Sequence, residues 1–373
     1  MRAILKQGLY VLIALGGIYA ALLAISGALV PQAKPAGGLD TSLAGGTIFA
    51  TEPKYVFLNR AALKPDVPRI VFVGASNSVV GFKQREVQPL LPNAEVDNLS
   101  VGGSNITQIG QIIDLVQDLQ DLAARRRTTF VIGMWYGMFT QDKFLWTTPD
   151  RHKGDTDIDI ERYRYGFYRR GETGPKQILP TDELQLGVTL IRPYLVFDAL
   201  SRLASKALRD RLSRRPPSRT DAERNATILS EADKDTAINY WRDQMHNDGT
   251  IDGEQFIVLR NLIGRAVARG SRVVLVDLPI PRWHAERSPF YPSYLMHKKD
   301  LLSALEGNEK ITCLEMADQD SDLDFSDEVH PKPRVSAQWA ARVAALIRTV
   351  GDDRAPAPGS QQPRGGSLAR EPP

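Results

Sequence analysis

The N-terminal segment holds the longest apolar run of the chain. After Arg2 and Lys6, no residue of 7–33 is charged, and 9–30 is dominated by Leu, Ile, Val, Ala and Gly. A helix of this length can cross the hydrocarbon core of a bilayer, which needs about 20 residues. Basic residues before such a run hold its start in the cytoplasm and put the rest of the chain outside. We therefore predict an uncleaved membrane anchor over 1–30.

A cleaved signal peptide is the alternative for this segment. The small residues Ser26, Gly27 and Ala28 offer a cleavage site. The apolar part of a signal peptide is usually only about 7–15 residues long, which favours the anchor. Residues 31–54, rich in Gly, Ala, Pro and Thr, are predicted to form a linker that lifts the folded domain off the membrane.

Short apolar runs then alternate with stretches of helical period. Continuous apolar runs closed by Gly or polar residues are typical of strands buried on both faces of a parallel sheet. Strands followed by helices favour an α/β domain over 55–350, with a doubly wound parallel sheet in three layers, as in flavodoxin-like folds. The predicted strands are 69–74, 94–99, 128–134, 272–278 and 311–316, and the predicted helices are 106–122, 255–268 and 336–350.

Residues 141–254 break this alternation with many charged and aromatic side chains. We predict a mostly helical insertion or cap there. Its basic, Pro-interrupted part, 206–224, is expected to be a solvated helix face and loop, with contact to an anionic polymer or lipid headgroup as the alternative. The tail over 351–373 is rich in Pro, Gly, Gln and Arg and is predicted to be disordered.

Composition excludes several classes of function. The 373 residues include 47 basic and 44 acidic side chains, a net charge of +3, so no global field favours nucleic acid. The single cysteine, Cys313, excludes an intramolecular disulfide and is expected in the core because it lies in an apolar run. His152, His246 and His297 lack partners at metal-ligand spacing, and no Gly-rich phosphate loop or dinucleotide motif is present. We expect neither a metal nor a cofactor.

Two separated motifs carry candidate chemistry. Gly74-Ala75-Ser76-Asn77-Ser78 follows the first predicted strand, where a serine on a tight turn can present its hydroxyl and backbone N–H to a substrate. A helix cap is the alternative role for these polar residues. Asp327 lies three residues before His330 and can orient its imidazole as a general base. Both motifs follow predicted strands, so one sheet edge could bring them together.

These residues resemble the motifs of the SGNH (GDSL-like) hydrolase superfamily. The first block matches at Ser76, a second glycine block matches at Ser100-Val101-Gly102-Gly103-Ser104-Asn105, and the last matches at Asp327 and His330. The resemblance implies that Ser76 is the nucleophile, His330 the general base and acid, and Asp327 its orienting partner. It also implies an oxyanion hole formed by the backbone N–H groups of Ser76 and Gly102 or Gly103.

The third block departs from the family pattern. Members usually supply an Asn there, whereas this chain reads Gly133-Met134-Trp135-Tyr136-Gly137. A lost oxyanion donor can lower the rate by about 10²- to 10³-fold. Asn77, Asn105, Tyr136 or a backbone N–H could replace it, or the protein is a slow or specialised transferase. Trp135 and Tyr136 are expected either to pack in the core or to form a wall for substrate.

The segment after the fourth predicted strand should also reach the active edge. Arg282, Trp283 and His284 could line a groove for a polar polymer, because aromatic faces pack on sugar rings and Arg pairs with acidic groups. The alternative is a Pro-stiffened loop whose aromatic side chain covers the core.

An N-terminal anchor followed by such a domain resembles a subgroup that works beside membrane-bound O-acyltransferases on bacterial surface polymers, such as alginate O-acetylation proteins and the D-alanyl-teichoic acid transfer factor. The resemblance implies a periplasmic serine esterase or O-acyltransferase, held by a single pass in the inner membrane. It would act through an acyl-Ser76 intermediate on ester-linked acyl groups, acetyl being the group we expect, of a surface polysaccharide. A non-catalytic scaffold that binds the polymer or an acyltransferase, and a lipid-directed esterase, are the alternatives.

Overall fold

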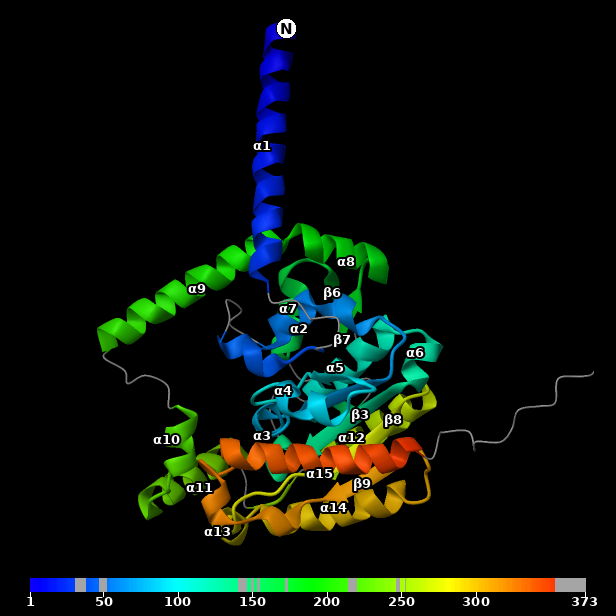
Figure 1. The fold of residues 1–373 in the computed structure, drawn as a ribbon, viewed down its shortest axis with the longest axis vertical. Helices are drawn as coiled ribbons and strands as arrows, with labels where there is room; N and C mark the ends of the chain where they lie inside the picture. Colours follow the sequence, from blue (N-terminus) through cyan, green and yellow to red (C-terminus); the bar gives the residue numbers. More distant parts are fainter. Residues whose placement is uncertain are drawn as a thin grey trace, which may run out of the picture.

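Five parallel strands form the centre of the computed structural model, which describes residues 1–30, 38–46, 52–139, 146–148, 151–152, 155–171, 174–213, 220–245, 249–251 and 253–352. The strands lie in the order β2-β1-β3-β8-β9, so the chain winds first to one side of β1 and then to the other. This confirms the predicted α/β class and parallel sheet. The strands are β1 (Arg69–Gly74), β2 (Glu95–Asn98), β3 (Thr128–Met134), β8 (Arg272–Asp277) and β9 (Ile311–Glu315) (Figure 1).

Helices cover both faces of this sheet because the side chains of a strand alternate between its faces. Val71 and Val73 of β1 belong to one core, and Ile70 and Phe72 belong to the other. The first core is covered by α2 (Glu52–Leu58), α5 (Ile106–Leu119), α12 (Gly253–Ala268) and α14 (Tyr291–Leu305), and the second by α3 (Ser76–Gly81), α4 (Gln84–Val87) and α15 (Pro333–Asp352). α6 (Leu122–Arg126), α13 (Arg282–Arg287) and the short 3-10 helices η1 (Thr41–Gly46), η2 (Arg60–Leu63), η3 (Gln88–Leu90), η4 (Tyr136–Phe139), η5 (Ala317–Gln319) and η6 (Asp322–Asp324) join these elements.

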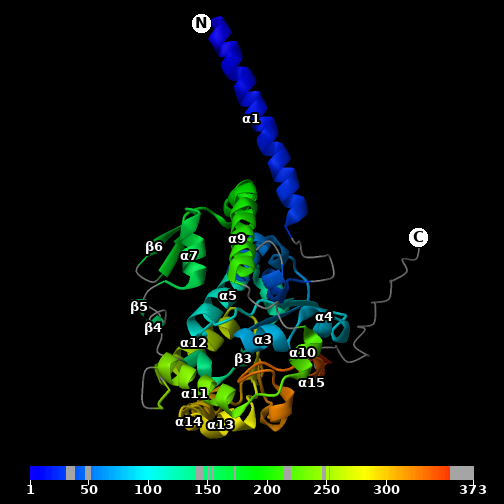
Figure 2. The same cartoon turned by 90° about the vertical axis from the view of Figure 1, so that its left-hand side faces the viewer.

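The insertion between β3 and α12 is mostly helical, with two small hairpins. Its helices pack around the domain at two ends of the molecule (Figures 1 and 2). Its elements are β4 (Trp146–Thr148), β5 (Arg151–His152), α7 (Asp157–Arg164), β6 (Tyr168–Gly171), β7 (Gly174–Gln177), α8 (Thr181–Leu190), α9 (Arg192–Ser213), α10 (Asp221–Ala226) and α11 (Glu231–Met245).

A buried ion-pair cluster joins the first two strands. Arg69 at the start of β1 is fully buried and pairs with Asp97 and, at 2.6 Å, with Glu95 of β2. It also donates to the carbonyl of Ala62 at 2.9 Å. Burial raises the pKa of Asp97, and Arg69 opposes that rise. A buried charge without its partner is strongly destabilising, so this cluster constrains the pairing of β1 with β2.

Part of the segment predicted as a linker packs against the sheet. Leu39 is fully buried, its carbonyl accepts from Asn98 N at 2.7 Å, and its N–H donates to Asp97 Oδ1 at 2.6 Å. β2 is an edge strand, and its free backbone groups need partners. Residues 38–46 therefore belong to the folded domain, while 31–37 and 47–51 of the predicted linker lie outside the described residues.

Cys313 is exposed, contrary to the expectation of a core cysteine. It lies on β9, which has a neighbouring strand only on the β8 side. An edge strand is covered less completely than a central one, and nothing in the apolar run around Cys313 distinguishes the two. Of the predicted disordered tail, 353–373 lies outside the described residues.

The N-terminal helix α1 (Arg2–Leu29) is long and apolar enough to cross a membrane, a test that a signal sequence also passes. It stands away from the domain in the views of Figures 1 and 2. Side chains up to Leu22 are exposed, whereas Ser26 and Val30 are buried against the domain.

The first turn of α3 lies directly on the ends of β1 and β3. A methyl group at Gly133 would lie 2.3 Å from Ser78 Oγ and 2.9 Å from Leu278 Cδ1, and one at Gly74 would lie 2.1 Å from Ser78 Oγ. Ser78 Oγ is buried and has no hydrogen-bond partner among the described residues. Glycine at both strand ends is therefore what allows the helix to approach so closely.

We expect Gly133→Ala to lower the free energy of unfolding by about 1–3 kcal/mol, because it overpacks this contact. The penalty should be smaller in a Ser78→Ala background, where the closest clashing atom is absent. Chemical unfolding of the four chains of this double-mutant cycle measures both effects.

Gly264→Ala is the matched control, because Gly264 lies in α12 with open space around its Cα. Alanine there should stabilise the helix by up to about 1 kcal/mol. Equal stabilities for Gly133→Ala and the parent chain would contradict the close contact.

Candidate active site

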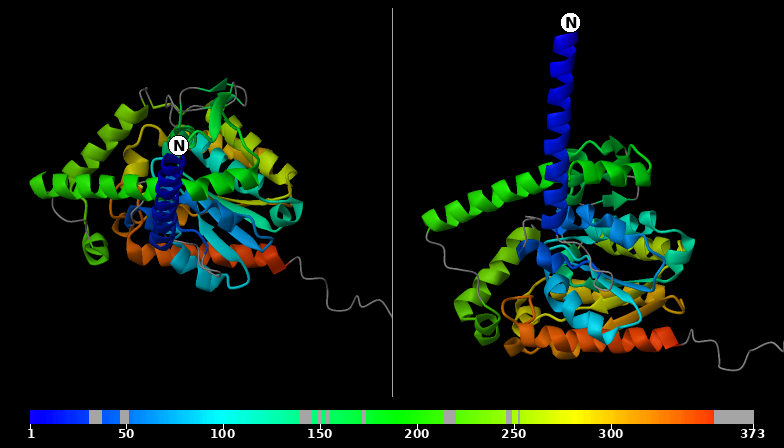
Figure 3. Two further views of the ribbon diagram at one scale, coloured as in Figure 1. Left: turned by 90° about the horizontal axis from the view of Figure 1, so that it is seen from above. Right: turned by 45° about the horizontal axis from the view of Figure 1, so that its top comes forward.

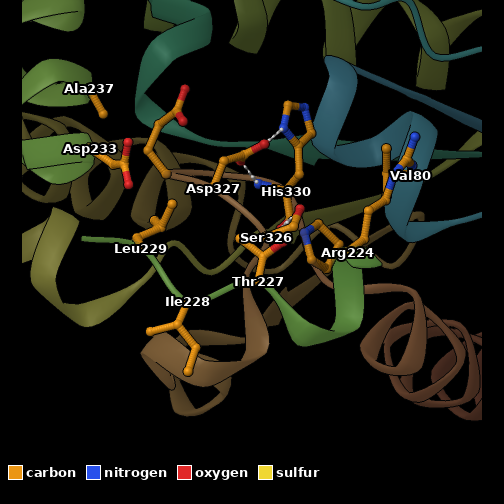
Figure 4. Close-up of a pocket in the computed structure, with 12 residues that line it drawn as sticks. Val80, Arg224, Thr227, Ile228, Leu229, Asp233, Ala237, Ser326, Asp327 and His330 are labelled. Atoms are coloured by element: carbon orange, nitrogen blue, oxygen red, sulfur yellow. Dashed lines mark hydrogen bonds and ion pairs between the residues drawn. The ribbon is translucent and has the colours of Figure 1, made fainter. Parts of the chain in front are cut away.

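Asp327 and His330 form a hydrogen-bonded pair in the loop between β9 and α15. His330 Nδ1 lies 2.8 Å from Asp327 Oδ2, and Asp327 Oδ1 accepts from the backbone N–H groups of Val329 at 3.0 Å and His330 at 2.8 Å. The loop closes on itself because Ser326 N donates to the carbonyl of His330 at 2.9 Å. The carboxylate is thereby fixed in place to orient the imidazole (Figure 4).

Electrostatics favour a charged pair. Burial acts to raise the pKa of Asp327, but the hydrogen bond and charge of His330 outweigh it, so this pKa lies below its ordinary value. Burial acts to lower the pKa of His330, but the hydrogen bond to Asp327 and the charges of Asp327 and Glu328 outweigh it, so this pKa is raised above 6.5. Arg224 opposes the rise. The imidazole is therefore a stronger base than a free histidine.

Ser76 is half-buried and begins α3, directly after β1. Its backbone N–H, in the first turn of the helix, has no acceptor among the described residues. The glycine turn predicted to complete an oxyanion hole lies beside it, because Gly74 O accepts from Val101 N at 3.0 Å and from Ser104 Oγ at 2.9 Å. Gly102 and Gly103 of this turn are exposed, and Gly103 has a φ of 70°.

No hydrogen bond joins Ser76 to His330 in the part of the chain that the structure describes. Val80 of α3, one helical turn after Ser76, does line the same cleft as His330. Figure 4 shows Val80 and Arg224 on the same side of the imidazole ring. In free enzymes, catalytic hydrogen bonds are often long and tighten only with substrate.

The cleft beside His330 has a volume of about 640 Å³ and lies between two segments distant in sequence. One wall is the 326–331 loop, and the other is the part of the insertion that contains α10, α11 and their connection. Arg224, Thr227 and Asp233 give this second wall a polar character. The insertion, for which the sequence supplied no role, thus forms half of the cleft.

Aromatic contacts hold this wall on the domain. Trp241 of α11 packs edge-on against Trp135 with ring centroids 4.8 Å apart and also contacts Tyr136 at 6.0 Å. Arg287 of α13 pairs with Glu231 of α11 at 2.5 Å. Trp135 and Tyr136 are both buried, so of the two roles expected for them the structure favours packing.

Tyr136 also belongs to a buried polar chain that reaches the 326–331 loop. Tyr136 Oη lies 2.6 Å from His284 Nε2, and His284 Nδ1 lies 2.6 Å from the carbonyl of Glu328. Burial lowers the pKa of His284 to about 4, so the ring is neutral at pH 7. A carbonyl only accepts, so Nδ1 carries the proton and Nε2 accepts from Tyr136. Trp283 and His284 are therefore buried, and His284 contacts the 326–331 loop through the carbonyl of Glu328.

The remaining predicted binding residues have structural partners. Asn77 is fully buried, and its Oδ1 accepts from Ser78 N at 2.9 Å. Asn105 is buried and caps α5, accepting from Gln108 N at 3.1 Å. Arg282 is exposed and forms two hydrogen bonds with Asp320, at 3.0 and 3.1 Å.

Sequence reasoning missed Arg224 and Asp233 as cleft residues. They lie about a hundred positions before His330, and no motif surrounds them. In the sequence, Arg224 is only the last residue of the basic segment 206–224. Its guanidinium forms no hydrogen bond or ion pair with the described residues, although it lies close enough to His330 to lower the pKa of the ring.

Comparison with known proteins provides no relative: no protein-family model matches the chain, and no curated protein matches it in sequence. Among the described residues, no three His, Cys, Asp or Glu side chains are grouped to hold a metal ion.

We expect Tyr136→Phe to lower the free energy of unfolding by about 1–3 kcal/mol, because it leaves the buried Nε2 of His284 without a donor. Chemical unfolding measures this change. Tyr240→Phe is the control, since Tyr240 is half exposed on α11 and water can hydrogen-bond to any group that its hydroxyl leaves. Equal losses in the two variants would show that the Tyr136 hydroxyl makes no special contact.

Proposed function

We propose that this protein is a membrane-anchored serine acyl-esterase or O-acyltransferase of the SGNH type. The observation that carries the proposal is the oriented Asp327–His330 pair, which borders a polar cleft together with α3, the helix that begins at Ser76. The domain order and strand arrangement are compatible with that superfamily.

The proposed reaction proceeds through an acyl-enzyme. Ser76 Oγ attacks the carbonyl carbon of an ester while its proton passes to His330 Nε2. His330 then gives this proton to the oxygen of the leaving alcohol, and the acyl group remains on Ser76. Water or a second hydroxyl attacks the acyl-enzyme, loses its proton to His330, and releases the product, after which the proton returns to Ser76.

Backbone groups would stabilise the oxyanion in this proposal. Ser76 N–H, at the N-terminal end of α3, and the N–H groups of the Gly102-Gly103 turn are the candidate donors. Backbone donors need no Asn in the third block, where Trp135 and Tyr136 instead pack against the insertion. Such donors can account for about 10²- to 10³-fold in rate each.

The charged residues that line the cleft favour a polar substrate over a lipid. Arg224 and Asp233 face the cleft from one wall, and Asp327 and Glu328 face it from the other. The helices α10 and α11, which contribute one wall, lie toward the end of the molecule away from α1 (Figure 1), where a lipid in the anchoring membrane would not reach. We propose an acylated surface polysaccharide as substrate, with α1 in the inner membrane, the domain in the periplasm, and a membrane-bound O-acyltransferase as the partner that supplies acyl groups.

Two observations favour a second candidate, a non-catalytic scaffold that binds the polymer. Within the described residues, Ser76 lacks a hydrogen bond to His330, and the third block lacks the family's Asn. A scaffold would keep the cleft but react with no serine-directed reagent.

The first test is hydrolysis of p-nitrophenyl acetate and labelling by a fluorophosphonate. Ser76→Ala should abolish the labelling and lower hydrolysis by at least about 10³-fold, since it removes the nucleophile. Ser303→Ala, at an exposed position of α14, is the matched control and should leave both unchanged. Labelling that persists in Ser76→Ala refutes the proposed nucleophile, and a parent chain that is neither labelled nor active favours the scaffold.

The rate should depend on pH through His330. The base must be neutral, and its pKa is raised above 6.5, so hydrolysis should fall as the pH drops through a value above 6.5. Asp327→Asn should move this acidic limb to lower pH and reduce the rate by about 10³- to 10⁴-fold. The raised pKa also stabilises the fold below pH 6.5, a contribution that is lost as the pH rises through the folded-state pKa. If hydrolysis by Asp327→Asn had the same pH profile as hydrolysis by the parent chain, the role of Asp327 would be contradicted.

A further inference from the structure

The insertion helix α9 presents an apolar stripe to solvent. Its exposed apolar side chains recur every three or four residues, the spacing that places them along one helix face. Phe197, Leu208 and Leu212 are 71%, 60% and 76% exposed. The full stripe is Tyr194, Phe197, Leu200, Ala204, Leu208 and Leu212.

This stripe points away from the domain. Leu195, Val196 and Ala199, on the opposite side of the first turns of α9, are buried in the core on the domain side. The second half of the helix projects beyond the body of the domain (Figure 1). On α8, Leu186 and Leu190 continue the exposed apolar surface. Among the described residues, this surface is covered only near its start, where Tyr194 packs edge-on against Tyr165 with ring centroids 6.4 Å apart.

α9 begins beside the C-terminal part of α1. The hydroxyl of Tyr19 donates to the carbonyl of Leu190, and a methyl at Gly27 would lie 3.5 Å from Arg192 Nη1. Seen from above, with α1 pointing toward the viewer, the green helix α9 runs crosswise to it (Figure 3, left), and in Figure 2 α9 is likewise at the end from which α1 leaves.

The exposed part of α1 matches the thickness of a bilayer. Residues 2–22 are exposed, and at 1.5 Å per residue they form about 31 Å of helix, against a hydrocarbon core of about 30 Å. Contact with the domain begins near the end of this part, where Tyr19 donates to Leu190, and Ser26 and Val30 after it are buried. If α1 spans the membrane, the junction of α8 and α9 is therefore at the level of the headgroups.

The charges of α9 suit that level. It contains five basic residues and two acidic ones, Asp198 and Asp210. Arg202, Lys206 and Arg209 lie on the side away from the apolar stripe, where long basic side chains can reach lipid phosphates while the stripe enters the acyl boundary.

We propose that α9, together with the exposed residues Leu186 and Leu190 of α8, lies flat in the interface of the membrane that α1 spans, as a second contact of the domain with an anionic lipid surface. The inference rests on the membrane anchor in the proposed function, and it is independent of the chemistry at Ser76. It gives the exposed basic and apolar residues of the insertion one common role.

The test uses the full chain in vesicles of phosphatidylcholine and phosphatidylglycerol. Cys313→Ser removes the native thiol, and an environment-sensitive fluorophore is then attached to single cysteines at Phe197→Cys, Leu208→Cys or Lys206→Cys. At the first two positions the emission should shift to the blue and aqueous iodide should quench it several-fold less than at Lys206→Cys. Raising the phosphatidylglycerol content should strengthen this protection, because basic residues near an anionic surface are stabilised there.

Two reference positions separate the outcomes. A label at Leu12→Cys reports whether α1 is in the bilayer, and one at Ser303→Cys reports full exposure to water. Protection at Leu12 without protection at Phe197 or Leu208 overturns the inference and leaves the anchor intact, whereas exposure at Leu12 overturns the anchor itself. Protection at Phe197 that arises only in native membranes would assign the stripe to a protein partner and also overturn the inference. Hydrolysis by Ser76 is assayed separately and depends on none of these results.

Discussion

The packing of Ser78 between two glycines controls the geometry of the candidate site. Ser78 lies in the first turn of α3, and only glycine at the ends of β1 and β3 leaves room for it. Because Ser76 begins the same helix, any displacement of that turn moves the proposed nucleophile. The turn at Gly102 is hydrogen-bonded to the same place through the carbonyl of Gly74, so the proposed nucleophile and its candidate oxyanion donors share one support.

The other half of the site depends on contacts over long sequence distances. The loop of Asp327 and His330 is locally closed, but its position relative to the sheet depends on the buried chain from Tyr136 through His284 to the carbonyl of Glu328. The Trp135–Tyr136 pair, placed where the family pattern has an oxyanion Asn, receives Trp241 of the insertion. A block that departs from the expected motif thus anchors the wall of the cleft.

Local patterns predicted the sheet well because strands buried on both faces appear as uninterrupted apolar runs, as at 69–74 and 128–134, whose bounds agree with β1 and β3. The Asp327–His330 contact could be predicted equally well, since the two partners are only three positions apart in the sequence. The exposure of Cys313 at the sheet edge could not be predicted, because the apolar run around it resembles a central strand. The Gly-rich segment around Leu39 likewise gives no sign that Leu39 pairs with Asn98. Arg224 and His330 line one cleft only in the tertiary structure, and no local pattern marks this proximity, which is why the cleft wall could not be predicted.

The helix α1 and the helices α10 and α11, which line the cleft, lie at different ends of the molecule (Figure 1). If α1 spans a membrane as proposed, the chain diffuses laterally, and its cleft moves in a plane parallel to the bilayer at a height set by the thickness of the folded domain. Under the proposed function, the encounter with an extended polymer that crosses this plane becomes a two-dimensional search, and sites at other heights are left untouched. Acyl groups would then be exchanged within a thin layer above the membrane, before the polymer moves beyond reach.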